Sequence, residues 1–286
     1  MKKITLFFCL FYSSVNAQTG KILQPINEAL QNKIGLELYS VRHELQKDVR
    51  GTLQKVKAMG INEVEVSGFF GYTPEDFKKA LEDAGLKPTS MLCSYEQLRD
   101  SLDVMIQRCK LFGIHYLGTA WIPHDKSFTR EEAVNAANLF NKAGLQLKEQ
   151  GIHFFYHAHG YEFLPKAQGT LFDLMASIMN KGIADFQLDV FWATRGGANP
   201  TALLNKYPHR FLSLHLKDLA YGYATGDSTG TSPDVSSVVL GTGQVDWKRV
   251  LDAAMKNGVQ QYFIEDESED AMNQIPQTLE YLHRLK

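Results

Sequence analysis

The chain has 286 residues, of which 44% are hydrophobic, and its 30 basic residues nearly balance its 32 acidic ones for a formal net charge of −2. This composition is typical of a folded globular protein and differs from that of a disordered chain. It also lacks the basic excess on which duplex binding depends, which argues against nucleic acid as a partner. Three cysteines are too few for a disulfide framework, although Cys93 and Cys109 could pair in an oxidising compartment.

The first residues have the pattern of a secretory signal peptide. Two lysines precede an apolar run over residues 4–12, and small residues follow up to Ala17. The apolar run is too short to span a bilayer, which takes about 20 residues. We therefore predict a signal peptide over residues 1–17, cleaved after Ala17, and a periplasmic or secreted product with no membrane attachment after cleavage. Residues 18–286 are expected to form a single domain.

The rest of the chain repeats one unit, a short apolar run followed by an amphipathic stretch. Glycine followed by an aliphatic residue marks many of the junctions, as expected where a helix ends and a strand begins. These pairs are Gly60-Ile61, Gly85-Leu86, Gly113-Ile114, Gly151-Ile152, Gly182-Ile183 and Gly258-Val259. The expected strands lie at residues 35–39, 63–66, 89–93, 116–120, 153–157, 186–190, 211–216 and 262–265. Helices are expected to begin near residues 48, 73, 95, 129, 170, 200, 245 and 269.

Eight strand–helix units in about 250 residues predict a (β/α)8 TIM barrel. A doubly wound open sheet is the alternative, but no G-x-G-x-x-G motif follows the first expected strand and no P-loop occurs in the chain. One stretch interrupts the repeat. Residues 221–239 are rich in glycine, serine and threonine and are too long for an ordinary connection. Following the seventh strand, they are either a flexible insertion or a lid over the active site.

The last four expected strands end in ionisable side chains. The carboxyl ends of the strands of a TIM barrel converge on one face, so these side chains predict a single shared site. Carboxylates and imidazoles together suit one divalent ion, with Mn, Co, Mg, Fe and Zn all compatible, and such an ion would act as a Lewis acid. The side chains are His157, His159 and Glu162 at the fifth strand, Asp189 at the sixth, His215 and Lys217 at the seventh, and Glu265 at the eighth.

Several stretches together resemble the sugar phosphate isomerase/epimerase family of xylose-isomerase-like TIM barrels. The resemblance covers nearly all of residues 18–286, and the combination of stretches is more specific than any one of them. They are residues 35–42 (GLELYSVR), 63–66 (EVEV), 156–159 (YHAH) with 162–163, 188–192 (LDVFW), 197–200 (GANP), 214–218 (LHLKD) and 241–247 (GTGQVDW).

The resemblance implies a metal site built from the last four strands. By position, Asp189, His215 and Glu265 are the implied ligands, and the fourth comes from the fifth strand. Related epimerases have a glutamate at the end of that strand, where this chain has His157. We favour Glu162 as the fourth ligand, with His159 as the rival and His157 nearer the substrate. This departure weakens any direct transfer of an epimerisation mechanism that uses two glutamates.

The other candidate residues each have a functional and a structural interpretation. Lys217 is expected to stabilise an oxyanion or donate a proton, or else to pair with Asp218 at the surface. Glu65 could reach a sugar hydroxyl or form hydrogen bonds within the barrel mouth. Trp192 is expected to stack on a sugar ring, and Arg195 either to bind substrate or to form a salt bridge at a helix entry.

These residues suggest an enzyme that removes a proton next to a sugar carbonyl. We expect a metal-dependent isomerase or epimerase that acts on a free keto- or aldo-sugar through an enediolate, with His157 or His159 as the base. The alternative is a lyase that cleaves 3-keto-glycosides by β-elimination with the same metal and base. A binding protein with a degenerate site is a further alternative. The sequence is also compatible with a homo-oligomer.

Overall fold

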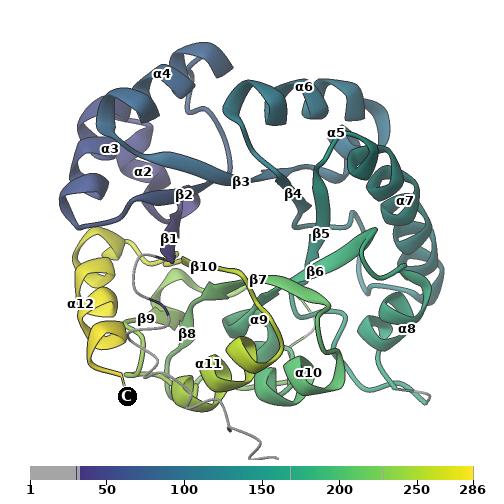
Figure 1. Ribbon diagram of the computed structural model, residues 1–286. Helices are drawn as coiled ribbons and strands as arrows, with labels where there is room; N and C mark the ends of the chain where they lie inside the picture. The colour runs from purple at the N-terminus through teal and green to yellow at the C-terminus, as the bar shows by residue number, and fades with distance from the viewer. Residues whose placement is uncertain (1–29, 31–32, 168, 228, 286) are drawn as a thin grey trace, which may run out of the picture.

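A computed structural model of the chain describes residues 30, 33–167, 169–227 and 229–285, so the expected signal peptide lies outside the described residues. Eight parallel strands close into a barrel, which confirms the predicted (β/α)8 TIM barrel (Figure 1). Their order around the barrel is β1-β10-β7-β6-β5-β4-β3-β2. The barrel strands are β1 (Ile34–Glu37), β2 (Glu63–Val66), β3 (Lys87–Cys93), β4 (Tyr116–Thr119), β5 (His153–His157), β6 (Ala184–Asp189), β7 (Phe211–Leu216) and β10 (Gln261–Ile264). Each overlaps one of the eight expected strands.

Helices surround the barrel on its outer side (Figure 1). They are α2 (Arg42–Leu45), α3 (Val49–Ala58), α4 (Pro74–Ala84), α5 (Tyr95–Asp100), α6 (Leu102–Phe112), α7 (Arg130–Glu149), α8 (Leu171–Ile178), α9 (Val190–Arg195), α10 (Pro200–Lys206), α11 (Trp247–Lys256) and α12 (Ala271–Arg284), with single 3-10 turns η1 (Leu38–Val41) and η2 (Asp234–Ser236). Among the described residues, no helix is long and apolar enough to cross a membrane.

Local sequence sets the ends of several helices as expected. The hydroxyls of Thr73, Thr129 and Thr170 each accept the backbone N–H three residues on, which caps α4, α7 and α8. Gly85 and Gly113 end α4 and α6 in the left-handed conformation, with φ of 70° and 67°. The short helix α9, directly after β6, was not expected, because the sequence pattern placed the next helix start near residue 200.

The barrel interior is filled by aromatic rings for which small residues make room. Phe155 on β5 lies beside Gly118 on β4, and a Cβ atom added at Gly118 would fall 2.0 Å from the Phe155 ring. Phe263 on β10 and Gly35 on β1 form the same pairing, with a distance of 2.8 Å. Because side chains alternate along a strand, the residues two positions beyond these rings also point inward and lie one layer nearer the carboxyl ends.

The long stretch after β7 folds back on itself. The short strands β8 (Asp218–Leu219) and β9 (Ser237–Val238) pair antiparallel and close its base. We call the connection between them, residues 220–236, the strap. Asp218 supports the next turn from below by accepting N–H groups from Gly241, Gly243 and Val245 and from the Trp247 indole. Asp218 is therefore a structural residue, and its suggested surface pair with Lys217 does not form.

Candidate active site

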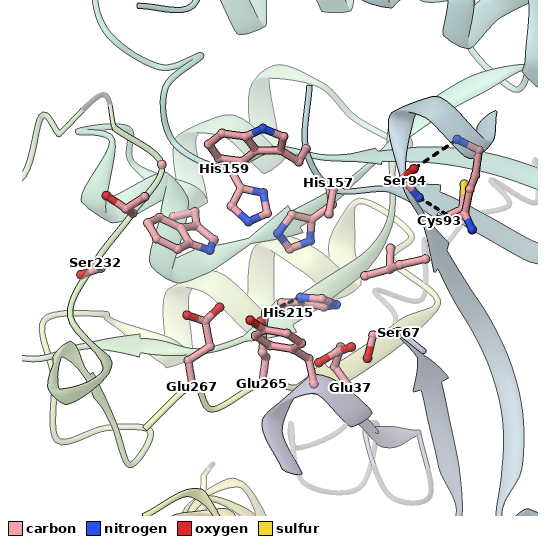
Figure 2. A pocket seen from close by; sticks show the side chains of 18 residues that line it. Glu37, Ser67, Cys93, Ser94, His157, His159, His215, Ser232, Glu265 and Glu267 are labelled. Carbon is pink, nitrogen blue, oxygen red and sulfur yellow. Dashed lines mark hydrogen bonds and ion pairs between the residues drawn. The ribbon is translucent and has the colours of Figure 1, made fainter. Parts of the chain in front are cut away.

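A cavity of about 690 Å³ opens at the carboxyl ends of the barrel strands. This volume is in the range of small-molecule sites. Figure 2 shows histidines and glutamates on its floor, with Ser232 of the strap at one side and Ser94 at the other. The lining residues are Glu37, Tyr39, Ser67, Leu92, Cys93, Ser94, Gln97, Ala120, Trp121, His157, His159, Trp192, His215, Gly230, Thr231, Ser232, Glu265 and Glu267.

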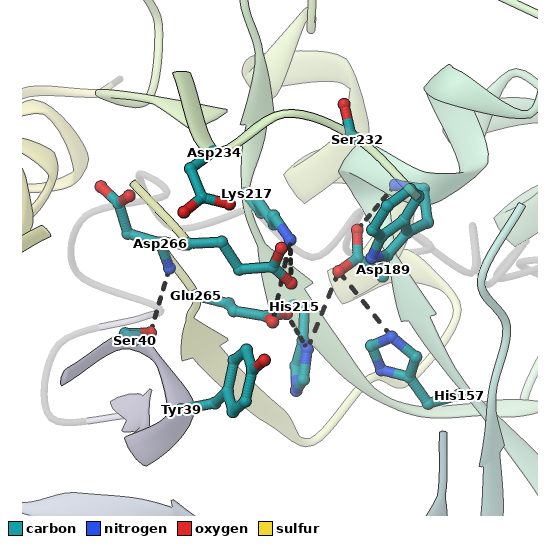
Figure 3. A network of polar contacts seen from close by, with 12 residues as sticks. Tyr39, Ser40, His157, Asp189, His215, Lys217, Ser232, Asp234, Glu265 and Asp266 are labelled. Atoms are coloured by element: carbon teal, nitrogen blue, oxygen red, sulfur yellow. Dashed lines mark hydrogen bonds and ion pairs between the residues drawn. The ribbon is translucent and has the colours of Figure 1, made fainter. Parts of the chain in front are cut away.

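Four buried side chains meet on the cavity floor, and each comes from the end of one of the last four barrel strands. They are His157, Asp189, His215 and Glu265, and one ligand atom from each lies within 4.8 Å of the other three. Asp189 Oδ2 is 3.9 Å from His157 Nε2 and 3.8 Å from His215 Nδ1 (Figure 3). His215 Nδ1 is 2.6 Å from Glu265 Oε2. We call this group the four-residue cluster.

The cluster fits a divalent metal ion. Asp189 Oδ1 accepts the Trp192 N–H and caps α9, whereas Oδ2 is buried without a hydrogen-bond partner among the described residues. Such an orphaned oxygen needs an explanation, and a bound cation is one of the few available. Separations near 3.8 Å are too long for hydrogen bonds but match ligand atoms that share an ion at about 2.0–2.2 Å from each. Two imidazoles and two carboxylates suit a borderline or hard divalent ion.

The electrostatics of the metal-free cluster reflect its crowding. Burial raises the pKa of Asp189 to about 8, and the negative charge of Glu265 adds to this effect. Burial opposes a charge on His215, but the carboxylates of Glu265 and Glu65 prevail and raise its pKa well above the ordinary value. Burial also opposes a charge on Glu265, yet Lys217 and His215 lower its pKa well below the ordinary value. The cluster thus contains closely packed groups whose charges a cation would balance.

Of the four ligands suggested by sequence, the structure brings together Asp189, His215 and Glu265, and it places Glu162 elsewhere. The Glu162 carboxylate accepts the Tyr156 hydroxyl and, at 3.2 Å, the His159 backbone N–H. Tyr156 and His157 are consecutive in β5 and therefore point to opposite sides of the barrel wall. Glu162 sits with Tyr156, so the preference for it as the fourth ligand does not fit the geometry, and His157 fills that place.

The predicted substrate-binding residue Glu65 lies beneath the cluster and does not line the cavity. Its Oε1 is 2.6 Å from His215 Nε2, and its carboxylate also accepts the Ser90 hydroxyl. Gln187 donates its amide N–H to both Glu65 oxygens at 3.2 Å and is 2.8 Å through Oε1 from His157 Nδ1. Of the two interpretations from sequence, hydrogen bonding within the barrel mouth describes Glu65 as the structure has it.

Lys217 is fully buried beside the cluster. Its Nζ is 2.6 Å from Glu267 Oε1 and 3.8 Å from Glu265 Oε1. It also lies over the rings of Phe191 and Trp192, at 4.7 Å and 5.0 Å from their centroids. Burial opposes its charge, but Glu265 and Glu267 prevail and raise its pKa. Lys217 is therefore a fixed positive charge next to the cluster.

His159 and two tryptophans form one wall of the cavity. The His159 ring lies 4.7 Å from the His157 ring and 5.2 Å from Trp192, and Trp121 meets it edge-on at 5.7 Å. Burial lowers the pKa of His159 to about 4, so the ring is neutral at pH 7, and no side chain of the described residues bonds its Nδ1. This wall combines a proton acceptor with aromatic faces that suit a sugar ring.

Arg195 faces away from the cavity. Its guanidinium donates to the Ala224 carbonyl and pairs with Asp227 at 2.7 Å, and its own carbonyl accepts the N–H groups of Gly226 and Asp227. Arg195 therefore anchors the strap, and the suggestion that it binds substrate does not fit its position. Gly230 of the strap sits so close to the wall that an added Cβ would lie 2.9 Å from the Trp121 ring. The strap thus forms part of the cavity.

Three acceptor residues of the site were given little or no weight in the sequence interpretation. Gln187 has an uncharged side chain that no metal or acid–base pattern singles out. Glu267 lies two residues past the last expected strand, and only the contact with Lys217 brings it to the cavity. Glu37 ends β1 beside Ser67, and burial together with Glu265 raises its pKa well above the ordinary value. The alternation of inward residues in β1 and β6 is the one signal that could have identified Glu37 and Gln187.

Comparison with known proteins defines the family. The family model of the xylose isomerase-like TIM barrel matches residues 53–285, and the chain belongs to this family. A sugar phosphate isomerase/epimerase from Parabacteroides distasonis ATCC 8503 is similar in structure, with a TM-score of 0.73, 27% identity, and coverage of 88% of this chain and 99% of that one. The closed barrel and the family match together support an enzyme related to sugar isomerases and epimerases.

Two further comparisons are more distant. A xylose isomerase-like TIM barrel protein from Mycobacterium smegmatis, solved in complex with magnesium, shares the fold with a TM-score of 0.67 at 13% identity, over 88% of this chain and 96% of that one. An inosose dehydratase from Clostridium botulinum (strain Alaska E43 / Type E3) is 29% identical over 92 residues. That match spans 32% of this chain and 30% of the dehydratase, so it is local.

Proposed function

We propose that the protein is a divalent-metal-dependent sugar isomerase or epimerase that acts on a free keto- or aldo-sugar through an enediolate. The observation that carries the proposal is the four-residue cluster on the floor of a cavity, with a proton acceptor on one wall and a buried cation beside it. Membership of the xylose isomerase-like family supports the reaction class.

His157, Asp189, His215 and Glu265 would hold the ion, whose identity among Mn, Co, Mg, Fe and Zn stays open. When bound, it supplies Lewis acidity that lowers the energy of the negative charge on the substrate oxygens. The remaining roles belong to the protein. His159 is neutral and faces the cavity, and it accepts the proton from the carbon next to the carbonyl.

Lys217 and Glu267 complete the proposed chemistry from the other side of the cluster. Lys217 keeps a positive charge 3.8 Å from Glu265, where it offsets negative charge that develops during proton removal. Glu267 lines the cavity and pairs with Lys217 at 2.6 Å, so this ion pair is suited to return a proton to the sugar. Trp192 and Trp121 pack against the sugar ring and exclude water from that side.

A lyase that cleaves 3-keto-glycosides by β-elimination is the second candidate. It begins with the same proton removal and differs only in what leaves the enediolate. The cavity supports it because space continues from the cluster toward Ser94 and Gln97 on one side and Thr231 on the other, room that a leaving group would occupy. The local similarity to an inosose dehydratase points to elimination as well. For either candidate we propose a carbohydrate substrate and an exported, periplasmic or secreted enzyme.

Metal analysis and product analysis test the proposal in sequence. Protein purified without chelator should hold about one equivalent of a divalent ion, lost in Asp189→Ala and His215→Ala. Free sugars and 3-keto-glycosides are then incubated with wild type in D₂O. Removal of the proton next to the carbonyl incorporates deuterium into the sugar. Isomerisation leaves the mass unchanged apart from this deuterium, whereas elimination splits the glycoside. Wild type that stays metal-free after incubation with Mn²⁺, or that exchanges no proton of any sugar, would contradict the proposal.

A further inference from the structure

The two histidines of the cluster rest on one hydrogen-bonded layer inside the barrel. This layer consists of Glu65 on β2, Ser90 on β3 and Gln187 on β6, all of which are completely buried. His215 Nε2 contacts Glu65 at 2.6 Å, and His157 Nδ1 contacts Gln187 at 2.8 Å. In both rings one nitrogen is bonded to this layer and the other faces Asp189, and this second nitrogen of His215 also lies 2.6 Å from Glu265 Oε2.

The position of protons in this layer follows from Glu65. Its two oxygens receive the Ser90 hydroxyl, the Gln187 amide N–H and the His215 Nε2–H group. A reversed Gln187 amide would set its oxygen against the carboxylate, acceptor against acceptor, so the amide orientation is fixed. The Gln187 oxygen must then face His157 Nδ1, which has to carry a proton in order to donate to it.

We infer that Glu65 and Gln187 form one shared support that fixes both histidines in opposite tautomers. His157 carries its proton on Nδ1, so its bare Nε2 faces the cluster. His215 carries a proton on Nε2, and its Nδ1, which donates to Glu265 in the metal-free cluster, would become the ligand nitrogen once a metal ion displaced that proton. Hydrogen bonds of this kind orient metal-ligating histidines and increase their basicity. One carboxylate thus acts on two ligands, directly on His215 and through Gln187 on His157. The inference rests on the metal site of the proposed function and not on the sugar chemistry.

Metal affinity measures this positioning role. Metal-free protein is titrated with Co²⁺, and the dissociation constant is read from the visible absorption of the bound ion. Gln187→Met keeps the side-chain volume and removes the hydrogen bonds, and Glu65→Gln removes the charge. We expect each to weaken Co²⁺ binding by about 10- to 100-fold. Gln244→Met is the matched control, because Gln244 makes two amide hydrogen bonds to backbone carbonyls outside the cavity, and it should bind Co²⁺ like wild type.

The double variant separates a shared support from two independent ones. If Glu65 and Gln187 act through one network, Glu65→Gln with Gln187→Met should lose about as much affinity as the more damaging single variant. Losses that multiply, or single variants that bind Co²⁺ like wild type, would overturn the inference. The melting temperature of each metal-free variant shows whether it is folded, and Ser90→Ala is a milder change that removes one donor to Glu65.

Imidazole ¹⁵N NMR of wild type tests the tautomers without any variant. In Zn²⁺-loaded protein with labelled histidines, we expect one ring protonated on Nδ1 and metal-bound through Nε2, and another with the reverse arrangement. The same nitrogen of His157 should carry the proton in metal-free protein, which decides the inference even if no metal binds. A bare His157 Nδ1 would overturn it. If the tautomers and the metal affinities are as expected but the protein acts on no sugar, the inference stands and the proposed reaction is rejected.

Discussion

Replacing Glu162 by glutamine tests how this buried carboxylate is used. Its side chain is completely buried, and burial raises its pKa from 4.5 to about 7, against the opposing effect of the Tyr156 hydroxyl. In the folded protein Glu162 thus stays protonated over a pH range in which the unfolded chain ionises. Glutamine is uncharged throughout, so Glu162→Gln removes this difference. The buried amide adds a destabilisation that does not depend on pH.

The sign follows from proton binding. Between pH 4.5 and about 7 the native state binds more protons than the unfolded state, so stability falls as the pH rises through this window. The contribution is fully present below the unfolded pKa and is lost once the pH passes the folded value. The difference between the folded and unfolded pKa values corresponds to about 3 kcal/mol of unfolding free energy in total, of which roughly 2.5 kcal/mol falls between pH 5 and pH 8.

Urea unfolding from pH 5 to pH 8 in the presence of EDTA measures the effect. The free energy of unfolding of Glu162→Gln minus that of wild type should increase by roughly 2.5 kcal/mol across this range. Glu149→Gln on the surface of α7 is the control for the loss of one exposed carboxylate. A difference that stays flat would show that Glu162 is already ionised at pH 5 in the metal-free protein, and it would refute the argument from burial.

Three other perturbations address the cluster, the barrel wall and the strap. A divalent ion at about 100 times its dissociation constant should raise the free energy of unfolding of wild type by about 2.7 kcal/mol. Calorimetry should show that His157→Gln loses most of this gain, and an equal gain in the variant would reject His157 as a ligand. Arg210→Met should lower the free energy of unfolding in urea by about 3–5 kcal/mol, because buried Arg210 bonds Asp185 at 2.7 Å and three backbone carbonyls. Adding Asp185→Leu should restore part of this loss, and no recovery would argue against the ion pair as its cause. Arg195→Ala should raise KM for the sugar at unchanged metal content because it releases the strap, and an unchanged KM would mean that the strap does not shape the cavity.

The strands and most of the cluster could be predicted because one physical rule governs both. Parallel strands of a closed barrel are buried on both faces, which makes them short apolar runs, and their carboxyl ends must meet on one face. An ionisable residue at the end of such a run therefore lies near its counterparts on the neighbouring strands. Asp189, His215 and Glu265 each occupy this position, and the structure brings all three together.

The fifth strand was ambiguous because three possible ligands, His157, His159 and Glu162, follow one another there. Strand alternation distinguishes His157 from Tyr156, but it ends with the strand at His157. Beyond it, a turn through Gly160, with φ of 97°, directs the chain back so that Glu162 meets Tyr156. No local pattern encodes that return, since it depends on Gly160 fitting against the Trp192 carbonyl and Gly196 of the next loop. Tertiary packing therefore determines which residue of the fifth strand and its loop joins the four-residue cluster.

Glu65 shows a second limit of reading strand ends from sequence. It lies one residue before the end of β2, next to Glu37 in β1, a position from which a side chain was expected to reach the substrate. Strands in a barrel are tilted and staggered, so equivalent positions along the sequence lie at different heights in the barrel. His215 is one layer higher and covers Glu65, with its other nitrogen at the cluster. A carboxylate under a histidine no longer contacts substrate, but it controls which nitrogen of that histidine is free. The stagger that places Glu65 below the cavity also places it where it supports His215 of the cluster.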